Sequence, residues 1–317
     1  MTEKNMRNKI IFGAVLLAAV FAVAIIFYRR DKKVGDMETS KIKVVTTLFP
    51  LYDIARNIGG EKAEVALLLP PGMEAHSFEP RPSDIIRINE ADVFVYTGKF
   101  MEPWAEDIIN GAVNKNLVTV DASRGVKMIA GVFHDSDEPV GSLDSHIWLD
   151  FDNARKMAEN IKEVFIAKDT ENTLFYERAA ADYEGRLSEF DLKYFEAFSN
   201  CENKEIIYGG HYAFGYMANR YGLKYSAAQG ISPDSEPTAS DLISLIDQIK
   251  KNNVKYIFYE ELSSPKIAEI IAGETNTKML LLNAAHNLTK DQFEKNVSFF
   301  DILENNLENL KVGLGCW

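Results

Sequence analysis

The order of short apolar runs and amphipathic helical patterns is the feature that most constrains the fold of this chain. Strand-like and helix-like segments alternate over residues 41–150 and again over residues 201–317. The stretch between them, residues 151–200, has helical periodicity and no strand-like run. Such alternation favours parallel sheets covered by helices. We therefore expect an α/β fold with two lobes, each a small, mostly parallel sheet flanked by helices, joined by a long connecting helix.

The expected strands are short apolar runs bounded by polar or glycine-containing turns. They lie at residues 43–48, 64–69, 92–98, 117–120, 205–210, 223–228, 254–259 and 278–283. The expected helices lie at residues 50–60, 83–91, 103–112, 240–251 and 263–274, with the longest at about 171–198 inside the helical block. Ser83 is expected to open one helix, and Ser264 to cap another that has Pro265 at its first position.

Residues 10–28, IIFGAVLLAAVFAVAIIFY, form an apolar segment of 19 residues without a charge. As a helix this segment spans roughly 28 Å, close to the thickness of a bilayer core. We expect an uncleaved membrane anchor followed by a polar linker within residues 1–40. A cleaved signal peptide is the alternative, because Ala22-Val23-Ala24 fits a small-residue cleavage site. No cysteine follows the segment closely, which excludes lipid attachment there.

Composition and motifs narrow the class of function. The hydrophobic content of 46% permits a well-buried core, and the net charge of −12 argues against nucleic acid as a partner. The sequence contains no H-E-x-x-H, no G-x-S-x-G and no Walker phosphate loop. These motifs carry the chemistry of common hydrolases and nucleotide-dependent enzymes. We therefore do not expect an enzyme.

The chain has two cysteines, Cys201 and Cys316, and their spacing is not that of a metal site. In an extracytoplasmic compartment they could form one disulfide that closes a long loop. Such a bond would stabilise the fold by at most roughly 4–5 kcal/mol in the chain-entropy model. The sequence leaves this disulfide and two free thiols as alternatives.

Four of the five histidines lie where one expected strand or loop ends and the next element begins. These are His76, His146, His211 and His286, two in each half of the chain. In open α/β sheets, ligands bind beyond the carboxyl ends of the strands. A single histidine is most often a surface or capping residue, and these four are too far apart for a local metal fingerprint. Because two of them lie in each half of the chain, they could meet across a cleft; their placement alone leaves a shared metal site and separate structural histidines as alternatives.

Six stretches of the sequence match a known protein family. They read VVTTLFPLYDIARNIGG, LLPPGMEAHSFEPRPSDIIRINEADVFVYTG, DSHIWLDFDNARKMAENI, GGHYAFGYMANRYGL, ISPDSEPTASDL and FYEELSSPKIAEIIAGET. With these stretches, the chain from about Lys41 to its C-terminus resembles the metal-binding solute receptors of bacterial ABC importers, the zinc and manganese group. The pattern P-G-x-x-x-H-x-F-E-P-x-P-x-D is the most specific of these matches.

The resemblance implies an extracytoplasmic receptor that binds a divalent metal ion between two lobes and delivers it to the membrane permease of an ABC importer. We assign the N-terminal lobe to residues 41–150, the helical connector to 151–200 and the C-terminal lobe to 201–317. We expect a monomer, held at the cell membrane by the N-terminal helix or exported with a cleaved signal peptide.

The resemblance also implies the metal ligands. The histidine of the family's H-x-F-E-P stretch falls on His76, the histidine of HIWLD on His146, and a third ligand position on His211. The fourth ligand of the family is usually an aspartate or glutamate just before a GLT-like turn. Here that position holds His286, followed by Asn-Leu-Thr, so the sequence departs from the family pattern.

Four imidazole ligands favour zinc over manganese, because imidazole nitrogen suits zinc and carboxylate oxygen suits manganese. Four neutral imidazoles can form a tetrahedral Zn²⁺ site, and such a closed site leaves no position for a catalytic water. We therefore expect a high-affinity Zn²⁺ receptor. The alternatives are a manganese-type receptor, a surface adhesin and, less favoured, a zinc hydrolase.

Several other polar residues are weaker candidates. His134, with Asp135, Asp137 and Glu138, lies in an irregular acidic stretch at residues 128–145, which is either a transient zinc-capture loop, with or without a second metal site, or a plain solvated loop.

Glu79 and Asp84 follow His76 and could orient an imidazole, but we favour a helix cap or a surface charge for each. Glu260 and Glu261 are reserve ligands in case His286 points away from the cluster. Trp148 is expected to pack in the core.

Overall fold

The computed structural model of this chain describes residues 41–131, 143–230, 233 and 236–317. Contacts divide the chain into one unit at Met1–Lys41 and a second, compact unit at Ile42–Trp317, which contains both lobes. The apolar segment at 10–28 and His134 lie outside the described residues. Among the residues that are described, none of the helices combines the length and the apolar character needed to span a bilayer.

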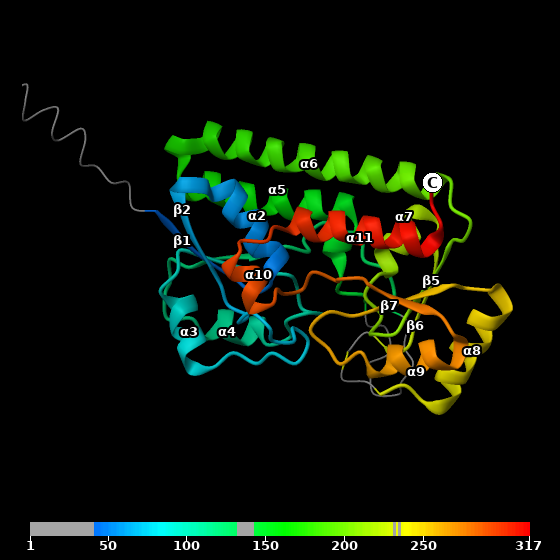
Figure 1. Cartoon of the computed structure of the whole chain (residues 1–317). Coiled ribbons are helices and arrows are strands. Elements are labelled where there is room, and N and C mark those ends of the chain that lie inside the picture. Colours follow the sequence, from blue (N-terminus) through cyan, green and yellow to red (C-terminus); the bar gives the residue numbers. More distant parts are fainter. Residues whose placement is uncertain (1–40, 132–142, 231–232, 234–235) are drawn as a thin grey trace, which may run out of the picture. The chain divides into compact units, whose positions relative to one another are not determined.

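The first sheet has four parallel strands in the order β2-β1-β3-β4. The strands are β1 (Ile42–Thr46), β2 (Ala63–Leu67), β3 (Val93–Tyr96) and β4 (Val118–Asp121). The helices between them are α2 (Phe49–Gly59), α3 (Pro82–Asn89) and α4 (Ala105–Gly111). Figure 1 shows these elements in blue and cyan in one half of the compact unit.

The second sheet repeats this topology in the order β6-β5-β7-β8, again with parallel strands. The strands are β5 (Glu205–Tyr208), β6 (Lys224–Ala227), β7 (Tyr256–Tyr259) and β8 (Lys278–Leu281). The helices are α7 (Gly215–Tyr221), α8 (Ala239–Asn252) and α9 (Lys266–Thr275). The predicted fold of two parallel sheets flanked by helices is therefore confirmed.

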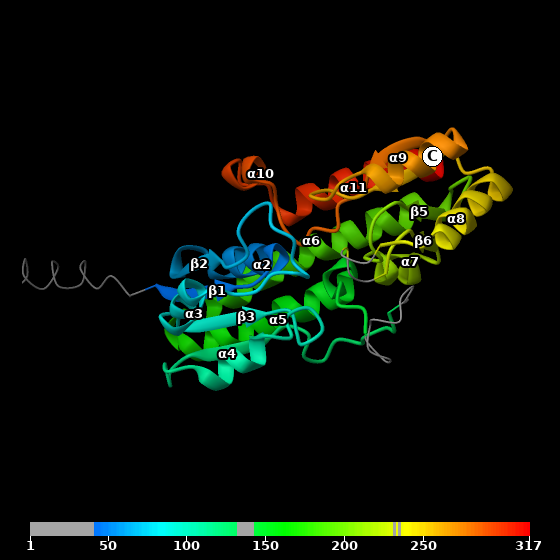
Figure 2. The same cartoon turned by 90° about the horizontal axis from the view of Figure 1, so that it is seen from below.

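A pair of helices joins the two sheets. Helix α5 (Phe151–Lys168) and helix α6 (Thr173–Ser199) pack against each other, and α6 extends along both lobes (Figures 1 and 2). The buried side chains of α6 recur every three or four residues and form one face: Tyr176, Ala180, Tyr183, Leu187, Phe190, Tyr194 and Phe198. This spacing places one apolar stripe against both lobes. The predicted long connecting helix is confirmed.

The C-terminal segment contains two helices that the sequence analysis missed, α10 (Lys290–Glu294) and α11 (Phe299–Leu314). Helix α11 begins with a capping box in which Ser298 and Asp301 bond each other's backbone N–H groups, and it ends at Gly315 with φ 66°. Both signals are visible in the sequence. Helix α11 packs against α2, α6, β7 and β8, so it contacts elements of both lobes.

The serines predicted to open two of the helices do not do so. Helix α9 begins at Lys266, with Pro265 at its N-cap, so Ser264 lies too early to cap it. Helix α3 begins at Pro82 rather than Ser83, and the Asp84 carboxylate accepts a hydrogen bond of 3.0 Å from the Arg81 N–H. Of the two roles considered for Asp84, the helix cap is thus the observed one.

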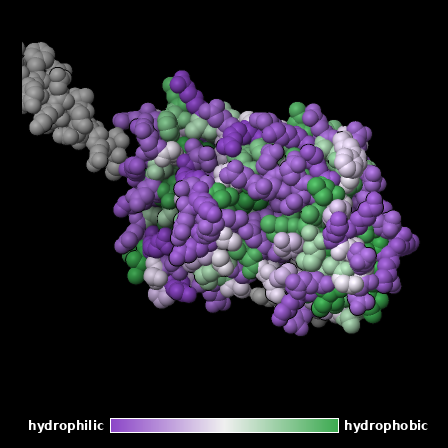
Figure 3. Space-filling model, in the orientation of Figure 1, coloured by the Kyte–Doolittle hydropathy of each residue, from purple (hydrophilic) through white to green (hydrophobic). Residues whose placement is uncertain are grey.

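Most of the buried side chains are apolar. One large core cluster includes residues from both lobes, and a second, smaller cluster packs α8 and α9 on the C-terminal sheet. The face shown in Figure 3 is mostly hydrophilic, with small scattered apolar areas. This surface agrees with the acidic composition of a chain whose net charge is −12.

Cys201 and Cys316 form a disulfide that joins the segment after α6 to the segment after α11. Of the two alternatives left by the sequence, the structure contains the bonded one. The bond closes a separation of 115 residues and thereby ties the last helix to the connector.

Reducing this disulfide, or replacing both cysteines by serine, should lower the free energy of unfolding by about 4–5 kcal/mol, because the unfolded chain gains the entropy of an open loop. Urea denaturation with and without a thiol-free reductant measures the change. The Cys201→Ser/Cys316→Ser variant serves as the control, since reductant should not alter its midpoint. A parent protein with the same midpoint in both conditions would contradict this account.

Candidate metal centre

Four imidazole rings meet between the two lobes. The Nε2 atoms of His76 and His146 are 3.2 Å apart, those of His146 and His211 3.1 Å, and those of His211 and His286 3.2 Å. One potential ligand atom from each of the four rings lies within 4.8 Å of the others. The structure thus brings together all four residues that the sequence placed in one cluster.

Each lobe contributes two of the rings. His76 lies in the loop between β2 and α3, and His146 directly precedes the 3₁₀ turn Ile147–Leu149 that leads into α5. His211 follows β5 and precedes α7, and His286 follows β8. Loops that follow parallel strands at the same end of a sheet are the usual ligand-binding positions in α/β folds.

The three Nε2 separations are close to those of a tetrahedral metal site. Four nitrogens at 2.0–2.1 Å from a tetrahedral zinc ion lie roughly 3.3–3.4 Å from one another. The three separations of 3.1–3.2 Å fit this geometry to within about 0.2 Å. No carboxylate belongs to this four-residue group.

Asp144 orients His146. The Asp144 Oδ1 atom lies 2.7 Å from His146 Nδ1 and also accepts a 2.9 Å hydrogen bond from the His146 backbone N–H. A carboxylate on Nδ1 holds the ring proton there, which leaves the Nε2 lone pair free to face the cluster. Both side chains are fully buried. The sequence analysis did not single out Asp144, although it lies two residues before a proposed ligand.

The Glu260 carboxylate lies beside the outer ring nitrogen of His211. Its Oε1 atom lies 2.7 Å from His211 Nδ1, and its Oε2 atom lies 3.4 Å from the His211 backbone nitrogen. Gly210 allows this approach, because a Cβ atom on it would lie 2.6 Å from the Glu260 carboxylate. Glu260, considered as a reserve ligand, therefore supports a ligand candidate instead. Glu261 is not part of the cluster.

The loop that carries His286 is bonded to the opposite lobe. The Asn287 side-chain amide donates to the carbonyls of Pro70 at 2.7 Å and Met73 at 2.9 Å, both in the loop that carries His76. The Phe49 N–H donates to the His286 carbonyl at 3.0 Å. The Asn287 side chain thus connects the two loops that carry His286 and His76.

His76 is the most accessible ring of the cluster. It is half-buried, whereas His146, His211 and His286 are buried. The Glu74 carboxylate fixes its backbone by accepting hydrogen bonds from the N–H groups of Ala75 at 2.7 Å and His76 at 3.1 Å. Glu79, in contrast, is exposed to solvent.

Trp148 packs beside the cluster, as predicted. Its ring centroid lies 5.5 Å from that of His146 and 5.6 Å from that of His286. Its indole N–H donates to the Ala284 carbonyl at 2.8 Å, across the two lobes. The fully buried indole therefore forms an apolar wall that fixes two rings at once.

Burial keeps three of the rings neutral. It lowers the pKa of His76, His146 and His286 well below the ordinary value, and the neighbouring His211 lowers all three further. Burial also disfavours the charged form of His211, but the carboxylates of Glu260, Glu74 and Asp144 together outweigh this effect, and the pKa of His211 is raised. Burial raises the pKa of the Asp144 carboxyl to about 7. Neutral imidazoles are the form that binds a metal ion.

Comparisons with known proteins identify the family of this chain. A family model described as ZnuA, zinc-uptake complex component A, periplasmic, matches residues 44–313. The high-affinity zinc uptake system protein ZnuA of Bacillus subtilis is 35% identical over 310 residues, which are 95% of this chain and 97% of that protein. The zinc-binding protein AdcA of Streptococcus pyogenes is 32% identical over 97% of this chain but only 62% of its own length. This chain therefore spans less than two thirds of that longer relative.

Solved structures show the same fold. The metal-dependent lipoprotein YcdH of Bacillus subtilis is 36% identical with a TM-score of 0.75, over 86% of this chain and 99% of that one. The Zn(II)-bound ZnuA-like domain of AdcA from Streptococcus pneumoniae is 32% identical with a TM-score of 0.75, over 87% and 99%. The laminin-binding protein Lmb of Streptococcus agalactiae, described as bifunctional with adhesin and metal-transporting activity, is 30% identical with a TM-score of 0.77, over 86% and 99%. The present chain belongs to the ZnuA family, the periplasmic components of zinc-uptake complexes.

Proposed function

We propose that this protein is an extracytoplasmic receptor that captures Zn²⁺ through His76, His146, His211 and His286 and delivers it to the permease of an ABC importer. The convergence of these four imidazole nitrogens from two lobes is the observation that carries the proposal. Relatives named for zinc uptake and zinc binding support it.

The donor set favours zinc among the divalent metals. Manganese prefers carboxylate and water oxygens in octahedral sites, whereas zinc accepts four imidazole nitrogens in a tetrahedron. The nearby carboxylates of Asp144 and Glu260 contact ring nitrogens on the far side of the imidazoles, so they act on the ligands rather than on the ion. Their negative charge offsets part of the charge of a bound cation.

Capture and release follow from ligands that two lobes share. A small displacement of one lobe changes the separation between ligands and breaks tetrahedral coordination. Helices α6 and α11 contact elements of both lobes, which restricts the lobes to small movements. His76 is the least buried of the four residues, so we propose that the ion passes this ring when it binds or leaves.

A receptor needs no open coordination position, and four protein ligands leave none for a catalytic water. We therefore assign no enzymatic activity. A further adhesive role is an alternative that the relative Lmb illustrates. We propose that the protein acts as a monomer at the outer side of the membrane, with residues 1–40 as its anchor or export signal.

Replacing any one of the four histidines by alanine should weaken zinc binding by more than about 100-fold, because losing a ligand exceeds the 10–100-fold loss typical of an outer-sphere partner. Isothermal titration of the purified protein with zinc, alone and in competition with manganese, measures the effect. His134→Ala serves as the control and should bind zinc like the parent. If His286→Ala binds like the parent, the fourth ligand is wrong; if manganese displaces zinc from the parent, the proposed metal is wrong.

Asp144→Asn and Glu260→Gln should each weaken zinc binding by about 10–100-fold, since each removes a carboxylate from beside the outer nitrogen of a ligand ring. Asp84→Asn, whose carboxylate caps α3 and, among the described residues, makes no hydrogen bond with any of the four histidines, is the matched control. The same titration reports the change, and thermal denaturation of the zinc-free variants separates it from a loss of folding. Unchanged affinity in both variants would contradict the orienting role of these carboxylates.

A further inference from the structure

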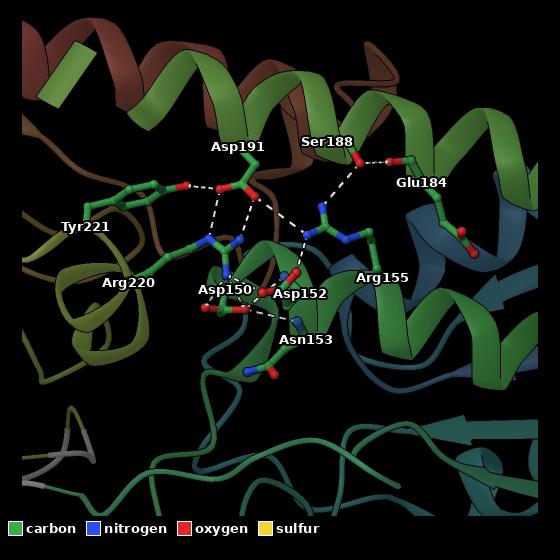
Figure 4. A network of polar contacts seen from close by, with 9 residues as sticks. All are labelled: Asp150, Asp152, Asn153, Arg155, Glu184, Ser188, Asp191, Arg220 and Tyr221. Carbon is green, nitrogen blue, oxygen red and sulfur yellow. Dashed lines mark hydrogen bonds and ion pairs between the residues drawn. The ribbon is translucent and has the colours of Figure 1, made fainter. Parts of the chain in front are cut away.

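A group of charged side chains lies where α7 of the C-terminal lobe meets the start of α5 and the middle of α6 (Figure 4). We call it the Arg220 network. It consists of Asp150, Asp152, Arg155, Asp191 and Arg220. Figure 4 shows these side chains pointing toward one another from three separate helical elements.

Arg220 is the centre of this network. Its guanidinium binds Asp191 through two parallel contacts, Nε to Oδ1 at 2.8 Å and the second terminal nitrogen to Oδ2 at 2.5 Å. Its other terminal nitrogen lies 2.7 Å from Asp152 Oδ2 and 3.2 Å from Asp150 Oδ2. One planar cation therefore joins the C-terminal lobe to both connector helices, a geometry that lysine cannot reproduce.

The network is partly buried, and it contains more carboxylates than guanidinium groups. The side chains of Arg220 and Asp191 are each 20% exposed and that of Asp150 is 15% exposed. Three carboxylates share two guanidinium groups, those of Arg220 and Arg155. Without Arg220, the three carboxylates at the start of α5 and on α6 would face one remaining guanidinium and repel one another, and α7 would lose its ion pairs with both helices.

Asp150 connects the network to His146, because the two residues are close in sequence. Asp150 caps α5 by accepting hydrogen bonds from the N–H groups of Asp152 at 2.8 Å and Asn153 at 3.0 Å. A single 3₁₀ turn separates it from His146, and the Leu149 N–H donates to the His146 carbonyl at 3.2 Å. The position of Asp150 therefore determines where the His146 backbone lies.

Helix α7, which carries Arg220, connects the network to His211. Near the start of α7, the Tyr216 hydroxyl donates to the Asp144 carbonyl at 2.9 Å. Gly215 is so close to this segment that a Cβ atom on it would lie 2.8 Å from Asp144 Oδ2. Arg220 holds the opposite end of α7. Helix α7 is thus fixed at both ends against the segment that carries His146.

We propose that Arg220 is a positioning residue for the metal centre. It touches no ligand, but it fixes the spacing between the lobes at the pair His146 and His211, whose Nε2 atoms are 3.1 Å apart. Opening of the Arg220 network then increases the rate at which the ion leaves. This inference rests on the proposed zinc-receptor function.

The test compares zinc dissociation from the full-length parent, Arg220→Gln and Arg220→Lys, measured by stopped-flow transfer to a chromophoric chelator at low and high salt. Arg220→Gln should release zinc about tenfold faster or more. Arg220→Lys should lie between the two, because it keeps the charge and loses the two-pronged contact with Asp191. Raising the salt concentration should accelerate release from the parent and hardly affect Arg220→Gln, since salt screens the network.

Arg124→Gln is the matched control. It removes an arginine from the exposed ion pair with Glu163, whose side chains are 67% and 51% exposed, and should leave release unchanged. The absorption spectrum of bound Co²⁺ should stay tetrahedral in every variant. If Arg220→Gln does not fold, Asp191→Asn, which keeps Arg220 and removes the paired carboxylate, should still release zinc faster.

Release from Arg220→Gln and Asp191→Asn within twofold of the parent would overturn the inference, as would equal acceleration in Arg124→Gln. A parent protein that binds no zinc would instead reject the proposed function. The two failures are therefore distinguishable.

Discussion

Four imidazole nitrogens held 3.1–3.2 Å from their neighbours are the constraint on which the rest of this structure depends. Such a cluster cannot carry several protons at once, because imidazolium charges at this distance repel one another strongly. Burial lowers the pKa of three rings, and two carboxylates bind the outer nitrogens of His146 and His211. The surroundings thus keep the inner lone pairs of His76, His146 and His286 available to a cation rather than to protons.

The fold supplies this cluster by repeating one topology. Each lobe has a four-stranded parallel sheet with the same strand order, and each presents two histidines from loops at the interface. Connections across that interface then fix their relative position: the Asn287 amide joins the loops of His286 and His76, and α7 is bonded at both ends to the segment of His146. The disulfide ties the last helix to the connector.

Sequence patterns predicted most of this fold, because strands and helices follow apolar periodicity that local residues determine. The four histidines could be predicted from their positions after strands together with a family resemblance. Asp144 could not, because several acidic residues lie in the same irregular stretch and only the folded chain selects one of them. The role of Glu260 depends on which side of an imidazole it reaches, and the role of Asn287 on a loop 217 residues away in sequence. Contacts between distant segments leave no local signal.

X-ray absorption at the zinc edge of the loaded protein tests the central claim most directly. The account predicts four nitrogen donors at about 2.0 Å, with the outer-shell scattering of imidazole rings. Coordination by two or fewer imidazoles, or by carboxylate oxygen or sulfur in place of nitrogen, would contradict it.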